Sequence, residues 1–235
     1  MKKQQQKLQK KLKQQKPEQQ RLKPEPHLKQ ELHLKQGTLN LRKVFVGLGN
    51  PGEKYRLTRH NAGFLAVDFL SEKTNIKLKK GFFSNYLYGK GVYEGEEIFL
   101  AKPLTFMNRS GLILNSLFKK SDTDLTNLIV ICDNMDLYPG VLRLKKEGGD
   151  AGHNGLYSII EQTGTGNFSR FYIGIGRPDD KAKIHDHVLG IPEEPEMTVF
   201  MNSFNLAADF LLKIVTSSSE KVMNEVNRIK NIPNS

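Results

Sequence analysis

The chain has 235 residues, a formal net charge of +11 and a single cysteine, Cys132. One cysteine excludes an intramolecular disulfide, and no apolar run approaches the roughly 18 residues that a membrane-spanning helix needs. The basic start is not followed by the apolar stretch of a secretory signal, so we expect a soluble, cytoplasmic protein.

Residues 1–36 differ in composition from the rest of the chain. They hold eleven Lys or Arg against three Glu, and so carry +8, while ten of them are Gln. Three prolines interrupt any helix that this segment could start. We interpret it as a disordered basic extension, either a solvated leader or a non-specific contact for RNA phosphates. Residues 37–235 have the size of one α/β domain.

The first predicted elements are a strand, a loop and a helix. Residues 42–48 run through β-branched and aromatic side chains to a Gly-Asn-Pro-Gly turn at 49–52, which predicts a buried strand. Phe64, Val67 and Leu70 then recur at helical spacing, and Asn61 is expected to cap that helix. The order strand, loop, helix follows.

The remaining elements continue to alternate. Two alternating segments, 83–89 and 97–102, predict a hairpin around Glu94-Gly95-Glu96. The pattern after them predicts a helix at 108–120, strands at 127–132 and near 140–146, a glycine-rich loop at 148–155, a helix at 155–163, a strand at 170–175 and helices from residue 197. We therefore expect an α/β fold, a single-domain three-layer sandwich whose twisted, mixed and mostly parallel sheet is flanked by helices.

The turn after the first strand matches the dinucleotide-binding pattern G-x-G-x-x-G from Gly47 to Gly52. Pro51 removes a backbone donor from that turn, however, and residues 53–56 do not begin an apolar helix that could hold a pyrophosphate. The nucleotide-binding interpretation is therefore weak.

Polar side chains recur where predicted strands end. Asn50 follows the first strand, Asn108 follows the hairpin and Asp133 follows the strand at 127–132, while His60 precedes the first helix. Strand ends meet at one edge of a parallel sheet, so these groups are candidates for one site.

Several ordered motifs carry a resemblance to a known family. They are Gly47-Leu48-Gly49-Asn50-Pro51-Gly52, Tyr55, Thr58-Arg59-His60-Asn61, Gly63-Phe64, Lys102-Pro103, Thr105-Phe106-Met107-Asn108, Ser110-Gly111, Asp133, Asp136, Gly152-His153-Asn154-Gly155-Leu156 and Ile173-Gly174-Ile175-Gly176. In this order the chain resembles the bacterial-type peptidyl-tRNA hydrolases over roughly residues 43 to 230.

The resemblance implies roles for individual residues. It makes His60 the general base and Asp133 the carboxylate that orients it, with Asn50, Asn108 and Asn154 placing substrate and water. It adds three further substrate-binding positions: Tyr55, Phe106 and Met107. The chemistry suits ester hydrolysis, because an imidazole that titrates near neutral pH can deprotonate water. It implies no cofactor and no metal.

The same resemblance implies peptidyl-tRNA, through its acceptor stem and 3′ end, as the partner. Arg143, Lys145 and Arg170 fall where the family carries basic residues, whereas Tyr157 and Tyr172 stand at positions that are often basic. We expect a monomer without an obligatory protein partner or membrane contact.

Other chemistry-bearing residues are assigned to structure. We place His153 outside the catalytic group as a loop-shaping residue, and expect His185-Asp186-His187 to lie in a solvated loop because no other ligands accompany it. Cys132 ends an apolar strand and is expected in the core.

Three functional hypotheses remain, in order: a peptidyl-tRNA esterase, an inactive RNA-binding relative and a dinucleotide-dependent oxidoreductase. The Gly-x-Ser-x-Gly elbow of serine esterases does not occur in the chain.

Overall fold

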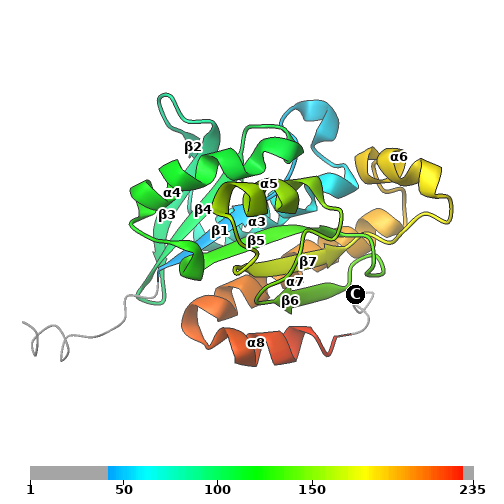
Figure 1. Ribbon diagram of the computed structural model, residues 1–235. Coiled ribbons are helices and arrows are strands. Elements are labelled where there is room, and N and C mark those ends of the chain that lie inside the picture. Colours follow the sequence, from blue (N-terminus) through cyan, green and yellow to red (C-terminus); the bar gives the residue numbers. More distant parts are fainter. Residues whose placement is uncertain (1–41, 230–235) are drawn as a thin grey trace, which may run out of the picture. The chain divides into compact units, whose positions relative to one another are not determined.

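The computed structural model describes residues 42–229. The predicted basic extension lies outside the described residues, so its disorder stays a prediction. Within the described part, a seven-stranded sheet has the strand order β2-β3-β4-β1-β5-β7-β6 (Figure 1). The strands are β1 Lys43–Gly47, β2 Lys79–Lys80, β3 Tyr86–Tyr93, β4 Glu96–Pro103, β5 Leu128–Asn134, β6 Leu142–Lys145 and β7 Ser169–Gly174.

The centre of the sheet is parallel and its flanks are antiparallel. Strand β1 pairs in parallel with β4 and β5, and β5 pairs in parallel with β7. The β2-β3, β3-β4 and β6-β7 pairs are antiparallel. The predicted mixed sheet is confirmed. Its parallel part consists of β4, β1, β5 and β7. The two middle strands of this part, β1 and β5, are buried on both faces and therefore read as apolar runs.

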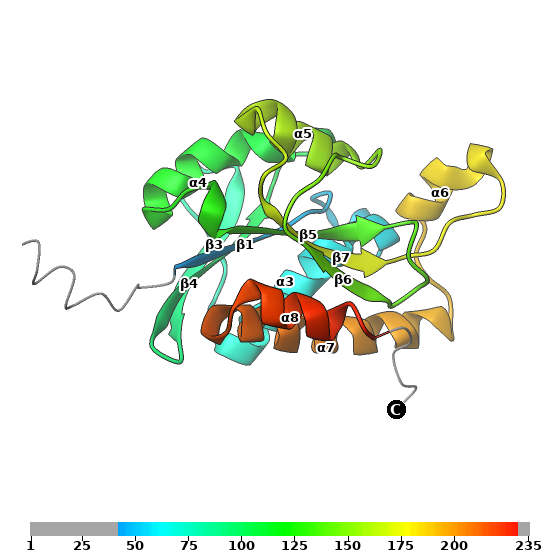
Figure 2. The ribbon, with the colours of Figure 1, turned by 60° about the horizontal axis from the view of Figure 1, so that its bottom comes forward.

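Helices cover both faces of the sheet, which gives the predicted three layers (Figure 2). On one face lie α3 Ala62–Thr74, α7 Glu196–Thr216 and α8 Ser219–Val226; on the other lie η3 Met107–Ile113, α4 Leu114–Ser121 and α5 Asn154–Thr163. Each face has its own core, because alternate residues of a strand point to opposite sides. Phe45 of β1 joins the α3 and α7 core, whereas Val44 and Val46 join the α4 and α5 core.

Glycines in the predicted fingerprint allow α3 to approach β1 closely. A Cβ on Gly47 would lie 2.2 Å from the carbonyl oxygen of Gly63, and a Cβ on Gly49 would overlap the Phe64 ring. Between Gly52 and α3 lie two short 3-10 helices, η1 Glu53–Tyr55 and η2 Arg59–Asn61. The helix that follows β1 therefore does not begin at the glycine turn, and the glycines serve packing.

Four local details differ from the sequence-based predictions. Asn61 occupies the N-cap position of α3, but its side chain makes no capping bond and instead pairs with the backbone of Asn50. The first half of the predicted helix at 108–120 is the 3-10 helix η3. His185 to His187 belong to the short helix α6, Ile184–Leu189, so the predicted solvated loop is wrong. The two-residue strand β2 was not predicted.

Helix α7 is the one described helix that is long and apolar enough to cross a membrane, and 56% of its apolar 18-residue stretch is buried inside the protein. Its buried side chains include Phe200, Phe204 and Leu211, which belong to the core beside α3.

Candidate active site

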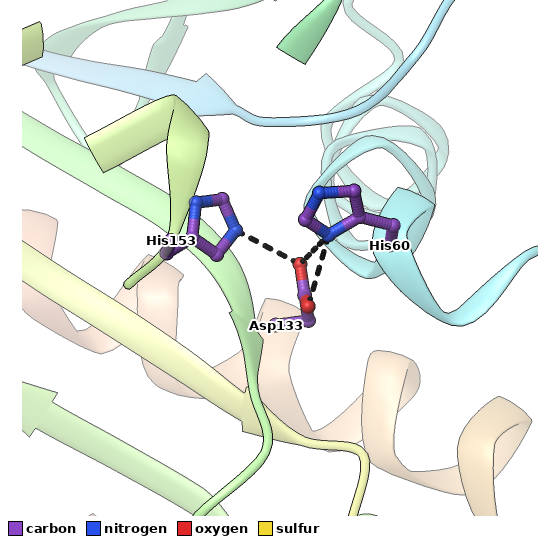
Figure 3. A group of neighbouring side chains, drawn as sticks. All are labelled: His60, Asp133 and His153. Carbon is purple, nitrogen blue, oxygen red and sulfur yellow. Dashed lines mark hydrogen bonds and ion pairs between the residues drawn. The ribbon is translucent and has the colours of Figure 1, made fainter. Parts of the chain in front are cut away.

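The candidate site lies where the carboxyl ends of the parallel strands β1 and β5 meet the loops that follow them. His60 comes from η2, Asp133 from the end of β5, and His153 from the position immediately before α5. The three side chains converge, with the Asp133 carboxylate between the two imidazoles (Figure 3). The sequence-based prediction that strand ends bring His60 and Asp133 together agrees with this geometry.

His60 is held by both oxygens of Asp133. Its Nδ1 lies 2.9 Å from Oδ1 and 3.0 Å from Oδ2, and the His60 residue is buried. Because a carboxylate accepts, Nδ1 carries the proton in the neutral ring and the lone pair lies on Nε2. No described side chain bonds to Nε2, which leaves it available for a substrate or a water.

The buried charge of Asp133 shifts the pKa of both partners. Burial alone would lower the pKa of His60, but the negative charge of Asp133 and the hydrogen bond to it outweigh burial and raise the pKa above 6.5. Burial alone would likewise raise the pKa of Asp133, yet the two imidazoles beside it hold that pKa well below its usual range. Asp133 is therefore ionised at all working pH values.

His153 contacts the same carboxylate, which the sequence-based interpretation did not foresee. Its Nε2 lies 3.0 Å from Asp133 Oδ1, and its Nδ1 accepts from the backbone N–H groups of Gly155 and Leu156. Two donors on Nδ1 fix the proton on Nε2, so His153 donates to Asp133. It shapes the start of α5, as expected, and also completes the hydrogen bonding of Asp133. A histidine directly before an apolar helix, in His153-Asn154-Gly155-Leu156, is the signal in the sequence.

The two contacts of His153 can be separated by mutation. We expect His153→Ala to lose the cap of α5, which costs about 1 kcal/mol, and to lower kcat about tenfold because Asp133 loses one hydrogen bond. His153→Ser restores a capping hydroxyl but is too short to reach Asp133. Its melting temperature should return toward that of the parent while kcat stays low. Equal kcat in the serine variant and the parent would contradict a role for the contact with Asp133.

Asn50 connects three segments of the site. Its side-chain oxygen accepts from the Met107 N–H at 2.9 Å, and its backbone is bonded in both directions by the Asn61 side chain. These bonds fix the turn after β1 against the start of η3. The amide Nδ2 of Asn50 makes no bond to any described residue, so it remains a free donor.

The other predicted substrate-binding residues lie around this centre. Phe106 is 57% exposed, and its ring meets that of Tyr55 edge to face with centroids 6.5 Å apart. Asn108 and Asn154 are exposed, whereas Met107 is buried. A cavity of about 200 Å³ opens beside the three central residues; its walls include His60, Asp133, His153, Asn154, Ile184 and Val188. Asn50, Tyr55, Phe106 and Asn108 lie outside that cavity.

Within residues 42–229, one group of side chains has the composition of a metal site. Nitrogen atoms of His60 and His153 and an oxygen of Asp133 lie within 4.8 Å of one another. Those same nitrogen atoms face Asp133 at hydrogen-bond distance, and the remaining nitrogen of His153 is occupied by backbone donors. The arrangement fits proton donation to a carboxylate better than metal ligation.

His187 is bonded to the carbonyls of Ile175 and Gly176 and anchors α6.

The three predicted tRNA contacts differ in their surroundings. Arg143 and Lys145 alternate on β6, are exposed, and line an open hollow next to the site. Arg170 is fully buried: its guanidinium donates to the carbonyls of Gly148 and Gly166 and lies 4.3 Å from the Phe168 ring. In this structure Arg170 is therefore not on the surface, and it holds the glycine-rich loop instead.

Tyr172 and Tyr157, at the positions where a basic residue is frequent, also differ from each other. Tyr172 is buried on β7, and burial raises its pKa to about 12, so it stays a neutral phenol. Tyr157 is 56% exposed on α5. Only Tyr157 has the exposure that a direct RNA contact requires.

Known proteins resemble this chain over almost the whole of its described part. The model of a family described as peptidyl-tRNA hydrolase matches residues 44–234. The peptidyl-tRNA hydrolase of Geobacillus thermodenitrificans is 43% identical over 185 residues, which cover 79% of this chain and 99% of that protein. That of Bacillus subtilis is 44% identical, with 78% and 97% covered. A crystal structure of peptidyl-tRNA hydrolase from Acinetobacter baumannii superposes with a TM-score of 0.77 at 37% identity, covering 81% of this chain and 97% of that one.

Proposed function

The chain belongs to the peptidyl-tRNA hydrolase family, and we propose that His60 is the general base with which it hydrolyses the ester between a peptide and the 3′ ribose of tRNA. The reaction class, hydrolysis of peptidyl-tRNA, follows from family membership. The roles of individual side chains rest on one observation: a buried carboxylate grips Nδ1 of His60 with both oxygens and leaves Nε2 free.

Each proton in the proposed reaction has a defined place. His60 Nε2 takes a proton from a water molecule, whose oxygen attacks the ester carbonyl carbon. Asp133 stabilises the imidazolium that forms. When the tetrahedral intermediate collapses, the C–O bond to the ribose breaks and Nε2 returns the proton to the departing 3′ oxygen. The products are tRNA and the free peptide acid, which loses the remaining water proton to solvent and becomes a carboxylate.

The reaction also needs hydrogen-bond donors for the oxyanion, the substrate and the water, and the asparagines of the site can provide them. The free Nδ2 of Asn50 is fixed by the bond from Met107 to its oxygen, so it is preorganised to donate to the oxyanion or to the substrate carbonyl. Asn154 lines the cavity and Asn108 is exposed outside it, and both supply further donors for substrate and water. Tyr55 and Phe106 offer aromatic surface for the substrate beside the asparagines.

The pH dependence of kcat/KM should report the Asp133–His60 pair. A general base must be neutral, and the charge of Asp133 raises the pKa of His60 above 6.5. Activity should therefore fall on the acid side with unit slope and a midpoint above pH 6.5. Initial rates between pH 5 and 9 at low substrate concentration measure this. A midpoint below 6.5 would contradict a base that is coupled to an ionised carboxylate.

We propose that Arg143 and Lys145 hold phosphates of the acceptor stem, because both are exposed at the hollow beside the site. Replacing both by Gln should raise KM about tenfold, leave kcat unchanged and lower the slope of log affinity against log salt by about 1.8, for two phosphates. Lys213→Gln, an exposed lysine on α7, is the matched control. Filter binding of deacylated tRNA at several salt concentrations measures the slope; an unchanged slope would remove both residues from the contact.

The function itself is tested with N-blocked aminoacyl-tRNA and free-amine aminoacyl-tRNA in the presence of a chelator. Release of the acyl group from the blocked substrate alone is expected, and the chelator should not slow it. Loss of turnover on chelation would show an essential metal. Binding of tRNA without any hydrolysis would favour an RNA-binding relative.

We further propose that the protein acts as a monomer in the cytoplasm, releasing tRNA for reuse in translation and ribosome rescue.

A further inference from the structure

The segment around strand β2 exposes aromatic and basic side chains that the proposed reaction does not use. Phe82 and Phe83 are 92% and 94% exposed, higher than any other large apolar side chain in the described part of the chain. Exposed lysines flank them, and an open hollow beside them is lined by Lys77, Lys79, Lys80 and Lys120. We call these six residues the β2 patch.

The charge of the β2 patch is not neutralised by neighbours. Between Ile76 and Tyr93 the sequence contains four lysines and no Asp or Glu. Lys90 is the lysine of this stretch that forms an ion pair, with Glu97, whereas no carboxylate of the described chain pairs with the four lysines of the β2 patch. The patch therefore presents a local excess of positive charge to solvent.

The two phenyl rings are presented outward by the backbone. Phe83 has a φ of 63°, which lies in the left-handed region of backbone conformation that residues other than Gly and Asn rarely adopt. The rings meet edge to face with centroids 4.6 Å apart and pack on no core residue. A strained backbone that exposes two aromatic rings gains nothing for folding, so the arrangement indicates a binding surface.

The β2 patch lies at the same end of the strands as the candidate active site. Strand β3 runs antiparallel to β4, so its first residue, Tyr86, is opposite the last residue of β4, Pro103. Leu104 N–H donates to the carbonyl of Asn85, and three residues later Met107 donates to Asn50. A short segment thus joins the patch to the centre of the site. Strands β2 and β6 are the two edge strands of the sheet, so the patch and the pair Arg143 and Lys145 lie on opposite sides of the central strands (Figure 1).

We propose that the β2 patch is a second RNA-binding surface that takes unpaired nucleotides, with Phe82 and Phe83 stacking on bases and the lysines contacting phosphates. Aromatic rings interleaved with lysines are the pattern by which proteins hold single strands without sequence preference. The charge excludes a cationic partner, and the position beside the tRNA-cleaving centre favours RNA over a lipid surface. The inference rests on the proposed function only for the choice of RNA.

The first test measures binding of a fluorescein-labelled 12-nucleotide oligouridylate by anisotropy. Phe82→Ser with Phe83→Ser should weaken binding about tenfold, or about 1.4 kcal/mol. Both side chains are almost fully exposed, so the variant keeps the fold. Met201→Ser, an exposed apolar side chain on α7, is the matched control and should bind like the parent. A blunt RNA duplex offers no unpaired base, so its affinity should not change with the double serine variant.

The second test separates charge from stacking. Lys79→Gln with Lys80→Gln should lower the slope of log affinity against log salt by about 1.4 for the single strand, whereas Lys213→Gln should not. Unchanged oligouridylate affinity in both double variants would overturn the proposal, as would loss of binding to anionic phospholipid vesicles with RNA binding intact. The binding assay does not need turnover, so a failure of the proposed hydrolysis would leave its outcome readable.

Discussion

Replacing His60 by alanine is expected to lower kcat for N-blocked aminoacyl-tRNA by about 10³-fold, the contribution of a well-placed general base. The reason is geometric: Nε2 of His60 is the free nitrogen of a ring whose other nitrogen is gripped by both oxygens of a buried carboxylate. Among the described imidazoles that line the cavity, His60 is the one that a buried carboxylate orients with Nε2 left free. Single-turnover release of the acyl group measures the effect.

Two control measurements show whether His60→Ala loses activity because it no longer binds tRNA or no longer folds. The dissociation constant for deacylated tRNA should remain that of the parent, because the RNA contacts assigned to Arg143 and Lys145 lie on β6. The melting temperature shows whether the protein stays folded when Asp133 loses its hydrogen bonds to His60. A folded, tRNA-binding His60→Ala protein that kept more than a tenth of the parent's turnover would show that another group is the base.

Asp133→Asn should be comparably damaging, with a loss of about 10²- to 10⁴-fold in kcat. Two ring N–H groups, on His60 and His153, point at this carboxylate. An amide keeps one acceptor oxygen and places an NH₂ where the second oxygen stood. The tautomer of His153 is fixed by backbone donors, so the asparagine oxygen takes the place of Oδ1 beside His153, and its NH₂ takes the place of Oδ2, which lies 3.0 Å from Nδ1 of His60. His60 then carries its proton on Nε2 and cannot accept one from water.

This explanation predicts a partial rescue. In Asp133→Asn combined with His153→Ser, the amide oxygen is released and can accept from Nδ1 of His60, which restores the working tautomer. The double variant should therefore turn over faster than Asp133→Asn alone, although His153→Ser by itself slows the parent. A double variant that is no faster than the single one would show that the negative charge, rather than the tautomer, is what Asp133 supplies.

The sequence was informative about the centre of the sheet because its physical signals are strong there. Strands buried on both faces read as apolar runs, and the polar residues that end them, Asn50 and Asp133, are conspicuous against that background. The family motifs added roles that the pattern alone left open, since a lone histidine such as His60 is usually structural.

The details that the sequence did not predict depend on tertiary contacts. Arg170 looks like a surface cation by composition, but β7 lies between β5 and β6, so its side chain is buried against Phe168 and loop carbonyls. His153 contacts Asp133 only because the glycine-rich loop returns to the end of β5. Strand β2 has two residues and owes its existence to pairing with β3, so no periodicity could reveal it.

The capping bonds of His153 make catalysis depend on the local stability of one helical turn. Backbone N–H groups at the start of α5 hold the imidazole that in turn holds Asp133, so the carboxylate is linked to the positive end of the helix. Fraying at a helix end requires less free energy than unfolding of the whole domain. Each opening of that turn withdraws a hydrogen bond from Asp133 while the sheet stays intact. Heating should therefore lower kcat at temperatures below the melting temperature of the fold.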